Sequence, residues 1–154
     1  YGDIVYSRAV LQALLKSSSD IAVTIDSDWE SYWRARNDNP LDDAETLKLA
    51  ADGEILEIGR KPKYIHEIEG QYMGLMKFSS KGVKQVKEIF RIALKSGELL
   101  GKPIENAYMT DLLQATINEG YQIQSVLISG GWVEVDTVDD LNAKVTLDRV
   151  NLIK

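Results

Sequence analysis

The stretch "YGDIVYSRAVLQALLKSSSDIAVTID", residues 1–26, decides the predicted fold. Its first residues are typical of the end of a strand, and Ser7 can cap a helix whose apolar residues between positions 10 and 15 follow the helical spacing. The segment from Asp20 to Asp26 is short, apolar and rich in branched side chains, which favours a buried parallel strand. Strand, helix and strand in this order predict the beginning of a βαβ unit and an α/β fold.

The rest of the chain continues this alternation of strands and helices. Residues 45–59 form two alternating runs joined by Asp52 and Gly53, which predicts an antiparallel hairpin. The segment 27–41, with two tryptophans and a proline, fits either a helix or a loop. Further strands are predicted at 70–79, 121–128 and 132–136, and further helices at 80–97, at 109–120 with Thr110 as a cap, and at 137–150. We therefore expect an α/β sheet that is parallel in part and flanked by helices.

Composition narrows the classes of function. The chain has 154 residues, a usual length for one domain, and a formal net charge of -6, and no basic stripe interleaved with aromatic residues is visible, so we expect no nucleic-acid partner. The longest apolar runs, such as 125–129, are far shorter than the ~20 residues that span a bilayer, so we expect no membrane partner and a cytoplasmic protein. The absence of cysteine and the single His66 argue against a thiolate metal site, a zinc site or a Ser-His-Asp triad.

Three acidic residues lie where predicted strands give way to helices. Side chains alternate across a strand, so Glu134 and Asp136 point to one face, and Asp3 follows the opening glycine in the first turn. Ligands of open α/β sheets bind beyond the carboxyl ends of the strands, and Mg2+ takes carboxylate oxygens together with water and phosphates. The three residues are therefore candidate metal ligands, although Asp136 can also serve only to favour the start of the following helix.

Four segments in order along the chain carry a resemblance to a known family: "YGDIVYS", "GQYMGLMKFS", "MTDLLQATINEG" and "GGWVEVDTVDDL". They resemble the nucleotidyltransferase superfamily, with its MobA-like and nucleoside-diphospho-sugar transferase folds, and most resemble its phosphocholine and phosphonate cytidylyltransferases, including domains fused to phosphoenolpyruvate-mutase-like proteins. The resemblance implies a Rossmann-like mixed, mostly parallel sheet flanked by helices with an inserted β-hairpin. It also implies that Asp3 and Asp136 are catalytic and hold Mg2+, with Glu134 as a further metal ligand.

The pattern of this family also includes an opening strand and a glycine-rich loop that cradles the triphosphate, and neither occurs in this sequence. We therefore expect residues 1–154 to be the C-terminal portion of a single nucleotidyltransferase domain whose N-terminal nucleotide-binding portion is missing, and to be inactive alone. The implied substrates are a nucleoside triphosphate, CTP in the nearest resemblance, and a small phosphorylated or phosphonylated amino-alcohol, and pyrophosphate is the product. A sugar-1-phosphate nucleotidyltransferase and a non-catalytic, regulatory module are alternatives, and an exposed sheet surface predicts a homo-oligomer.

Candidate acceptor-binding residues are less sharply marked. Trp29 and its neighbours Tyr32 and Trp33 can form an aromatic wall for an ammonium group, or can pack a flap against the sheet. Glu69 and Tyr72 are further candidates for lining the acceptor pocket. The basic segment "RKPK", residues 60–63, can contact phosphate or be a solvated loop.

Overall fold

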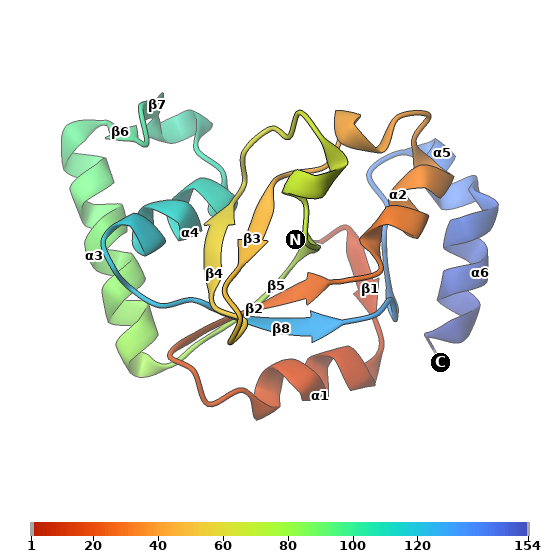
Figure 1. Cartoon of the computed structure of the whole chain (residues 1–154), viewed down its shortest axis with the longest axis horizontal. Coiled ribbons are helices and arrows are strands. Elements are labelled where there is room, and N and C mark those ends of the chain that lie inside the picture. The colour runs from red at the N-terminus through yellow and green to blue at the C-terminus, as the bar shows by residue number, and fades with distance from the viewer. Residues whose placement is uncertain (1, 154) are drawn as a thin grey trace.

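A three-stranded sheet, ordered β5-β2-β8, lies at the centre of the computed structural model, which describes residues 2–153 (Figure 1). Its middle strand, β2 (Ile21–Asp26), is buried at all six positions. It pairs in parallel with β8 (Gln124–Ile128) and antiparallel with β5 (Gln71–Phe78). The buried strand predicted from the apolar run is therefore confirmed, and the sheet is mixed, as expected.

A second, two-stranded pairing joins β1 (Ile4–Tyr6) antiparallel to β9 (Trp132–Glu134). Helix α1 (Arg8–Lys16), capped by Ser7 as predicted, connects β1 to β2, but β1 pairs with β9 and not within the central sheet. The expectation that the sheet is mostly parallel is wrong for residues 2–153, where β2 and β8 form the one parallel pair of named strands. Strand direction depends on where each connection returns the chain, and the alternation of elements does not contain that information.

The predicted hairpin consists of β3 (Leu47–Leu49) and β4 (Ile55–Ile58), which pair antiparallel. Gly53 has φ +84° in the turn, a value that favours glycine. The hairpin is tied to the central sheet because Ile55 N–H donates to the carbonyl of Ile123 (2.8 Å). A second, very short hairpin, β6 (Glu98–Leu99) with β7 (Lys102–Pro103), has no counterpart in the prediction.

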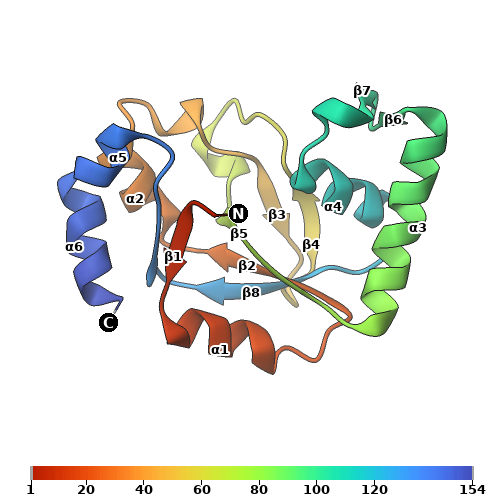
Figure 2. The ribbon, with the colours of Figure 1, turned by 180° about the vertical axis from the view of Figure 1, so that it is seen from behind.

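The helices gather at the two ends of the sheet and beneath it (Figures 1 and 2). Helices α3 (Ser80–Ser96) and α4 (Met109–Asn118) lie together at one end, and α2 (Trp29–Arg36), α5 (Val138–Asn142) and α6 (Lys144–Leu152) lie at the other. Short 3₁₀ helices span Pro40–Asp42, Ile65–Glu67 and Ile104–Asn106. The segment 27–41, which fits either a helix or a loop by sequence, is thus a helix followed by a 3₁₀ turn.

Two helix predictions need correction. Helix α4 begins after Tyr108, whose N–H donates to the carboxylate of Asp111 (2.8 Å), so Thr110 lies inside the helix and is not its cap. The last predicted helix is divided at Ala143, whose extended backbone (φ -63°, ψ 134°) separates α5 from α6. Thr137 caps α5 with Asp140 in a capping box, as the spacing predicts.

Three apolar clusters of described residues hold these parts together, and the smallest joins α3, α4 and β6 through Ile89, Ala93, Leu99 and Ala115. Another surrounds the central strand and contains residues of β2, β3, β4 and α4. The third packs α2 against β9 and is dominated by aromatic rings, with Trp132 and Tyr32 fully buried. No helix within residues 2–153 has the length and apolar character needed to cross a bilayer.

Candidate metal and acceptor site

The pairing of β1 with β9 brings the three predicted metal ligands together. Val135 N–H donates to the carbonyl of Asp3 (2.9 Å), and Ile4 lies opposite Glu134 in the ladder. One ligand oxygen from each of Asp3, Glu134 and Asp136 lies within 4.8 Å of the others. The sequence pattern predicts Asp3 at the carboxyl end of the first strand, but in the structure Asp3 precedes β1. The antiparallel pairing places the start of β1 beside the end of β9.

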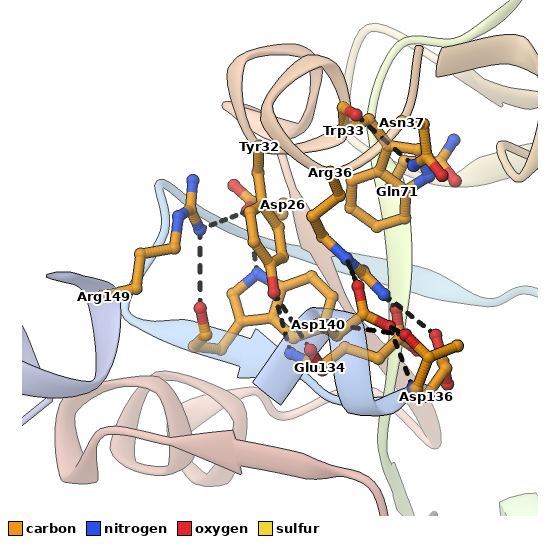
Figure 3. Close-up of polar contacts among 12 residues, drawn as sticks. Asp26, Tyr32, Trp33, Arg36, Asn37, Gln71, Glu134, Asp136, Asp140 and Arg149 are labelled. Carbon is orange, nitrogen blue, oxygen red and sulfur yellow. Dashed lines mark hydrogen bonds and ion pairs between the residues drawn. The ribbon is translucent and has the colours of Figure 1, made fainter. Parts of the chain in front are cut away.

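A buried guanidinium lies against this acidic cluster (Figure 3). Arg36, at the end of α2, has a side chain that is only 4% exposed. Its Nη1 contacts Glu134 Oε2 at 3.0 Å, its Nη2 contacts Asp136 Oδ2 at 2.9 Å, and its Nε contacts Asp140 Oδ1 at 2.9 Å. Each of its three nitrogens therefore binds a different carboxylate, and Arg36 joins α2, the end of β9 and α5.

Helix α2 holds the main chain of β9 as well as its side chains. Tyr32 and Arg36 are four residues apart and so share one face of the helix. The Tyr32 hydroxyl accepts a hydrogen bond from Glu134 N–H (3.0 Å) and donates one to the Glu134 carbonyl (3.2 Å). The Arg36 guanidinium carbon lies 5.1 Å from the Tyr32 ring centroid and 5.8 Å from that of Trp33, within the range of cation-π attraction.

The protonation of these groups follows from burial and from Arg36. Burial raises the pKa of Glu134, and the hydrogen bond from Arg36 only partly offsets this, while the nearby charge of Asp136 raises it further. Burial also acts to raise the pKa of Asp140, but hydrogen bonds from Arg36 and Thr137 outweigh it and lower that pKa. Burial acts against the charge of Arg36, yet its bonds to Asp140 and Glu134 raise its pKa above the ordinary value.

The donor set fits a hard divalent cation. Asp3, Glu134, Asp136 and Asp140 supply four carboxylates against the one guanidinium of Arg36, which leaves a formal charge of -3. All ligand atoms are carboxylate oxygens, which Mg2+ prefers over nitrogen or sulfur, and Mg2+ completes its octahedron with water or substrate phosphates. In the described part of the chain, the carboxylate of Asp3 makes no hydrogen bond or ion pair and so remains available to a metal.

A cavity of about 280 Å³ opens beside these carboxylates. Among residues 2–153, no lysine, arginine or histidine lines it, but four acidic residues do, Asp43, Glu45, Glu134 and Asp136. The other lining residues are Trp33, Gln71, Tyr72, Met73, Gly74, Tyr108 and Thr110. Such a cavity favours a cationic group over an anionic one.

Glu45 is held firmly at the wall of this cavity. The amide of Gln71, itself 3% exposed, accepts from Glu45 N–H (3.2 Å) and donates to the Glu45 carbonyl (2.7 Å). The Glu45 carboxylate accepts a hydrogen bond from the Thr110 hydroxyl (3.3 Å). Burial raises the pKa of Glu45, because these contacts do not fully replace the lost water. The carboxylate therefore lacks a cationic partner in contact with it among the described residues.

Of the three predicted acceptor residues, one lines the cavity and two do not. Tyr72 lines the cavity, and its hydroxyl contacts the sulfur of Met76 (3.4 Å). Glu69 is not part of the cavity lining, because its carboxylate binds Leu49 N–H (2.8 Å) and ties β3 to the start of β5. Trp29 is 4% exposed and packs edge-on against Trp33, with ring centroids 6.2 Å apart. Trp29 therefore lies in the packing of α2 and not in the cavity lining, whereas Trp33 of the same predicted aromatic wall lines the cavity.

Two lysine side chains bind the main chain. Lys61, in the basic segment considered as a phosphate contact, donates from Nζ to the carbonyls of Leu41 and Asp42, both at 2.5 Å, and Lys77 Nζ donates to the carbonyl of Ser17. Neither lysine lines the cavity.

Sequence reasoning missed Arg36, Asp140, Asp43 and Glu45 as parts of the site. The spacing of Tyr32 and Arg36 would have placed both on one face if residues 29–36 had been assigned to a helix. Nothing in the sequence pairs that helix with residues 134–140, which lie about a hundred positions away and meet it only through the fold.

Comparison with known proteins finds relatives in sequence and in fold. The chain is 38% identical over 145 residues to the CTP:phosphoglutamine cytidylyltransferase of Campylobacter jejuni, a match that covers 94% of this chain and 57% of that protein. Among solved structures, the inositol-1-phosphate CTP transferase from T. maritima matches with a TM-score of 0.63 and 16% identity, over 98% of this chain and 53% of that one. The nucleoside-diphosphate-sugar pyrophosphorylase from Vibrio cholerae matches with a TM-score of 0.55 and 15% identity, over 94% of this chain and 53% of that one.

The solved structures share the fold of this chain, and all three proteins are longer than it. No family model matches the sequence. The chain spans little more than half the length of the proteins that it resembles. The 38% identity over nearly the whole chain makes it similar in sequence to a cytidylyltransferase, and its mixed sheet and order of elements are similar to those of solved nucleotidyltransferase structures.

Proposed function

We propose that this chain is the C-terminal portion of a Mg2+-dependent cytidylyltransferase that acts on a small phosphorylated or phosphonylated amino-alcohol and releases pyrophosphate. The observation that carries the proposal is the convergence of Asp3, Glu134 and Asp136 at one edge of the fold. Its support from relatives is the 38% identity to a protein described as a CTP:phosphoglutamine cytidylyltransferase.

In the proposed reaction, an oxygen of the acceptor's phosphate or phosphonate attacks the α-phosphorus of CTP. A new P–O bond forms to the acceptor, the bond from the α-phosphorus to the oxygen that bridges it to the β-phosphorus breaks, and pyrophosphate leaves with that electron pair. A divalent cation bound by Asp3, Asp136 and Glu134 would neutralise phosphate charge and align the reacting groups. The protein's own part is positioning, because this kind of transfer needs little covalent chemistry from side chains.

The acidic cavity supports an acceptor with an ammonium group. Glu45 and Asp43 line the same cavity as Glu134 and Asp136, so an acceptor can present its cation to the first pair and its phosphate to a metal at the second. Gln71, Tyr72 and Thr110 supply neutral polar contacts there. A hexose 1-phosphate carries no cation to offset the buried charge of Glu45, so the alternative of a sugar-1-phosphate acceptor is disfavoured.

A second acceptor follows from the relative's description. Glutamine carries an α-ammonium group, as amino-alcohols do, so a phosphorylated glutamine also meets the charge requirement of the cavity. Both acceptors are phosphorylated amines, and direct comparison of them as substrates distinguishes the two.

Two further proposals concern the state of the protein. We expect the 154-residue chain alone to be inactive, because it spans 57% of the relative and its sequence contains no glycine-rich triphosphate loop. Exposed apolar residues on the strands, such as Val5 and Leu127, support association with a second copy or with the rest of the parent protein. We expect the parent protein to be cytoplasmic.

The test is pyrophosphate release by the full-length parent protein with CTP and either phosphocholine, aminoethylphosphonate, phosphoglutamine or glucose 1-phosphate. We expect turnover with an amine acceptor that requires Mg2+ and falls by about a hundredfold or more in Asp136→Asn. The matched control is Asp148→Asn, which changes an exposed acid on α6. Full activity of Asp136→Asn would refute the metal assignment, and preference for glucose 1-phosphate would refute the amine acceptor.

A further inference from the structure

Arg36 contacts two of the expected metal-binding carboxylates and leaves one oxygen of each without a partner among the described residues. Arg36 binds Glu134 through Oε2 and Asp136 through Oδ2. The second oxygen of each, Oε1 and Oδ1, makes no hydrogen bond or ion pair within residues 2–153. A guanidinium and a divalent cation can therefore occupy the cluster together, but each lies within a few ångströms of the other's charge.

Arg36 is built into this position and is not a surface side chain that happens to fold over it. It is 4% exposed and lies against the rings of Tyr32 and Trp33. Asp140, which binds its Nε, is itself held by the N–H (3.0 Å) and the hydroxyl (2.8 Å) of Thr137. A buried guanidinium with three partners cannot leave without exposing uncompensated charge, so Arg36 is a permanent neighbour of the metal position.

Asp3 and Glu134 do not depend on Arg36 for their location, and the bond from Val135 N–H to the Asp3 carbonyl holds the residue before Asp136. The ladder between β1 and β9 holds Asp3 and Glu134 through the main chain, and the Tyr32 hydroxyl makes two further bonds to the backbone of Glu134. Loss of Arg36 would therefore leave the acidic groups close together. What Arg36 adds to the cluster is a positive charge, and this charge opposes a second cation.

We propose that Arg36 is a resident counter-cation that shares Glu134 and Asp136 with the divalent metal and so keeps metal binding to the free protein weak. This inference rests on the proposed function of the same carboxylates. Its consequence is that the metal is retained firmly only when nucleotide phosphates supply additional negative oxygens, which suits the way in which Mg2+ binds with its substrate. Arg36 thus acts through its charge on Glu134 and Asp136 and does not itself contact the metal or the substrate.

The experiment measures Mn2+ binding to the 154-residue chain by electron paramagnetic resonance, without nucleotide or acceptor. Arg36→Met removes the charge and keeps an unbranched apolar stem against Tyr32, and we expect it to bind Mn2+ about tenfold more tightly than the wild type. Arg36→Lys keeps the charge, and we expect its affinity to stay within about threefold of the wild type. Asp136→Asn, measured in parallel, reports whether these carboxylates are the Mn2+ site.

If Arg36→Met does not fold, the double variant Arg36→Met/Asp140→Asn takes its place. Asp140→Asn removes one of the acids that would be left unpaired and keeps an oxygen that can accept from Thr137. The same gain in affinity is expected of this double variant. A merely structural role of Arg36 predicts weaker or unchanged binding, not tighter binding.

The outcomes separate this inference from the proposed function. Wild-type binding that is lost in Asp136→Asn but not tightened in Arg36→Met would overturn the role of Arg36 and leave the metal site standing. Equal tightening in Arg36→Lys and Arg36→Met would also overturn it, because charge would not be the cause. Binding that appears only in Arg36→Met would support it, and absence of binding in every variant would overturn both proposals.

Discussion

Replacing Asp26 with asparagine removes one acceptor from a polar network centred on a fully buried carboxylate. Asp26 ends β2 and is 0% exposed. Its Oδ1 accepts from the N–H groups of Asp28 (2.9 Å) and Gly130 (3.0 Å), and its Oδ2 accepts from the indole N–H of Trp132 (2.8 Å). A carboxylate offers two accepting oxygens, but asparagine offers one oxygen and an NH2 group that only donates. At least one buried N–H must then face another donor.

The magnitude follows from the bonds that are lost. A buried donor left without an acceptor costs about 1–3 kcal/mol, and each remaining bond to a neutral amide is weaker than a bond to a charged oxygen. We expect Asp26→Asn to lower the free energy of unfolding by about 2–4 kcal/mol. In a chain of this size 1 kcal/mol shifts Tm by about 2–4 °C, so Tm should fall by about 4–16 °C. The loop at Gly130 leads into β9, so the acidic cluster should be disturbed as well.

The assay is urea unfolding followed by tryptophan fluorescence, with Tm measured by circular dichroism. The matched control is Asp28→Asn, because the side chain of Asp28 is exposed and its backbone N–H remains. This control should change the free energy of unfolding by less than about 0.5 kcal/mol. A loss of less than about 1 kcal/mol in Asp26→Asn would refute the claim that all three donors depend on the carboxylate.

Three further perturbations test other parts of the structure. Burial raises the pKa of Glu45 above 4.5, so the folded state binds its proton more readily than the unfolded chain, and this contribution to stability is complete below 4.5 and lost as the pH rises through the folded pKa. Glu45→Gln, which can still bond Thr110, should therefore gain stability over the wild type as urea unfolding is moved from about pH 4 to about pH 7, and a constant difference would contradict this. Gly82→Ala should lower the free energy of unfolding by about 1–3 kcal/mol although alanine favours helices, because the new Cβ would lie 2.1 Å from the carbonyl oxygen of Asp20; unchanged urea unfolding would exclude that close approach. Trp29→Ala should cost about 3–5 kcal/mol of stability, and reduced acceptor affinity in a variant as stable as the wild type would restore Trp29 to the acceptor site.

The local structure could be predicted where it depends on local physics. Branched apolar residues at 21–26 cannot remain in water, and they form the buried strand. Ser7 and Thr137 satisfy the first N–H groups of their helices, and Gly53 adopts the positive φ that a tight turn needs. One failure is also local in origin: Asp111 caps α4 by accepting from Tyr108 N–H, whereas the sequence pattern predicted Thr110 as the cap.

The candidate site was predictable only in part. Glu134 and Asp136 share a strand face because side chains alternate, and the resemblance to nucleotidyltransferases supplied Asp3 as their companion. Arg36 was not predictable, because its three partners lie about a hundred residues away in sequence. Trp29 was assigned to the wrong environment because an aromatic ring with acidic neighbours has the same sequence pattern whether it faces a ligand or the core.

Local sequence was enough to predict the strands except for the short β6–β7 hairpin, most helix starts, the tight turn and the types of side chain that can hold a cation, since these depend on periodicity, capping and charge within a few residues. The antiparallel pairing of β1 with β9, the burial of Trp29 and the placement of Arg36 between three carboxylates come only from the folded chain. The physical reason is that pairing direction and desolvation depend on which distant segments meet. Only that meeting turns scattered acids and an arginine into one charged cluster.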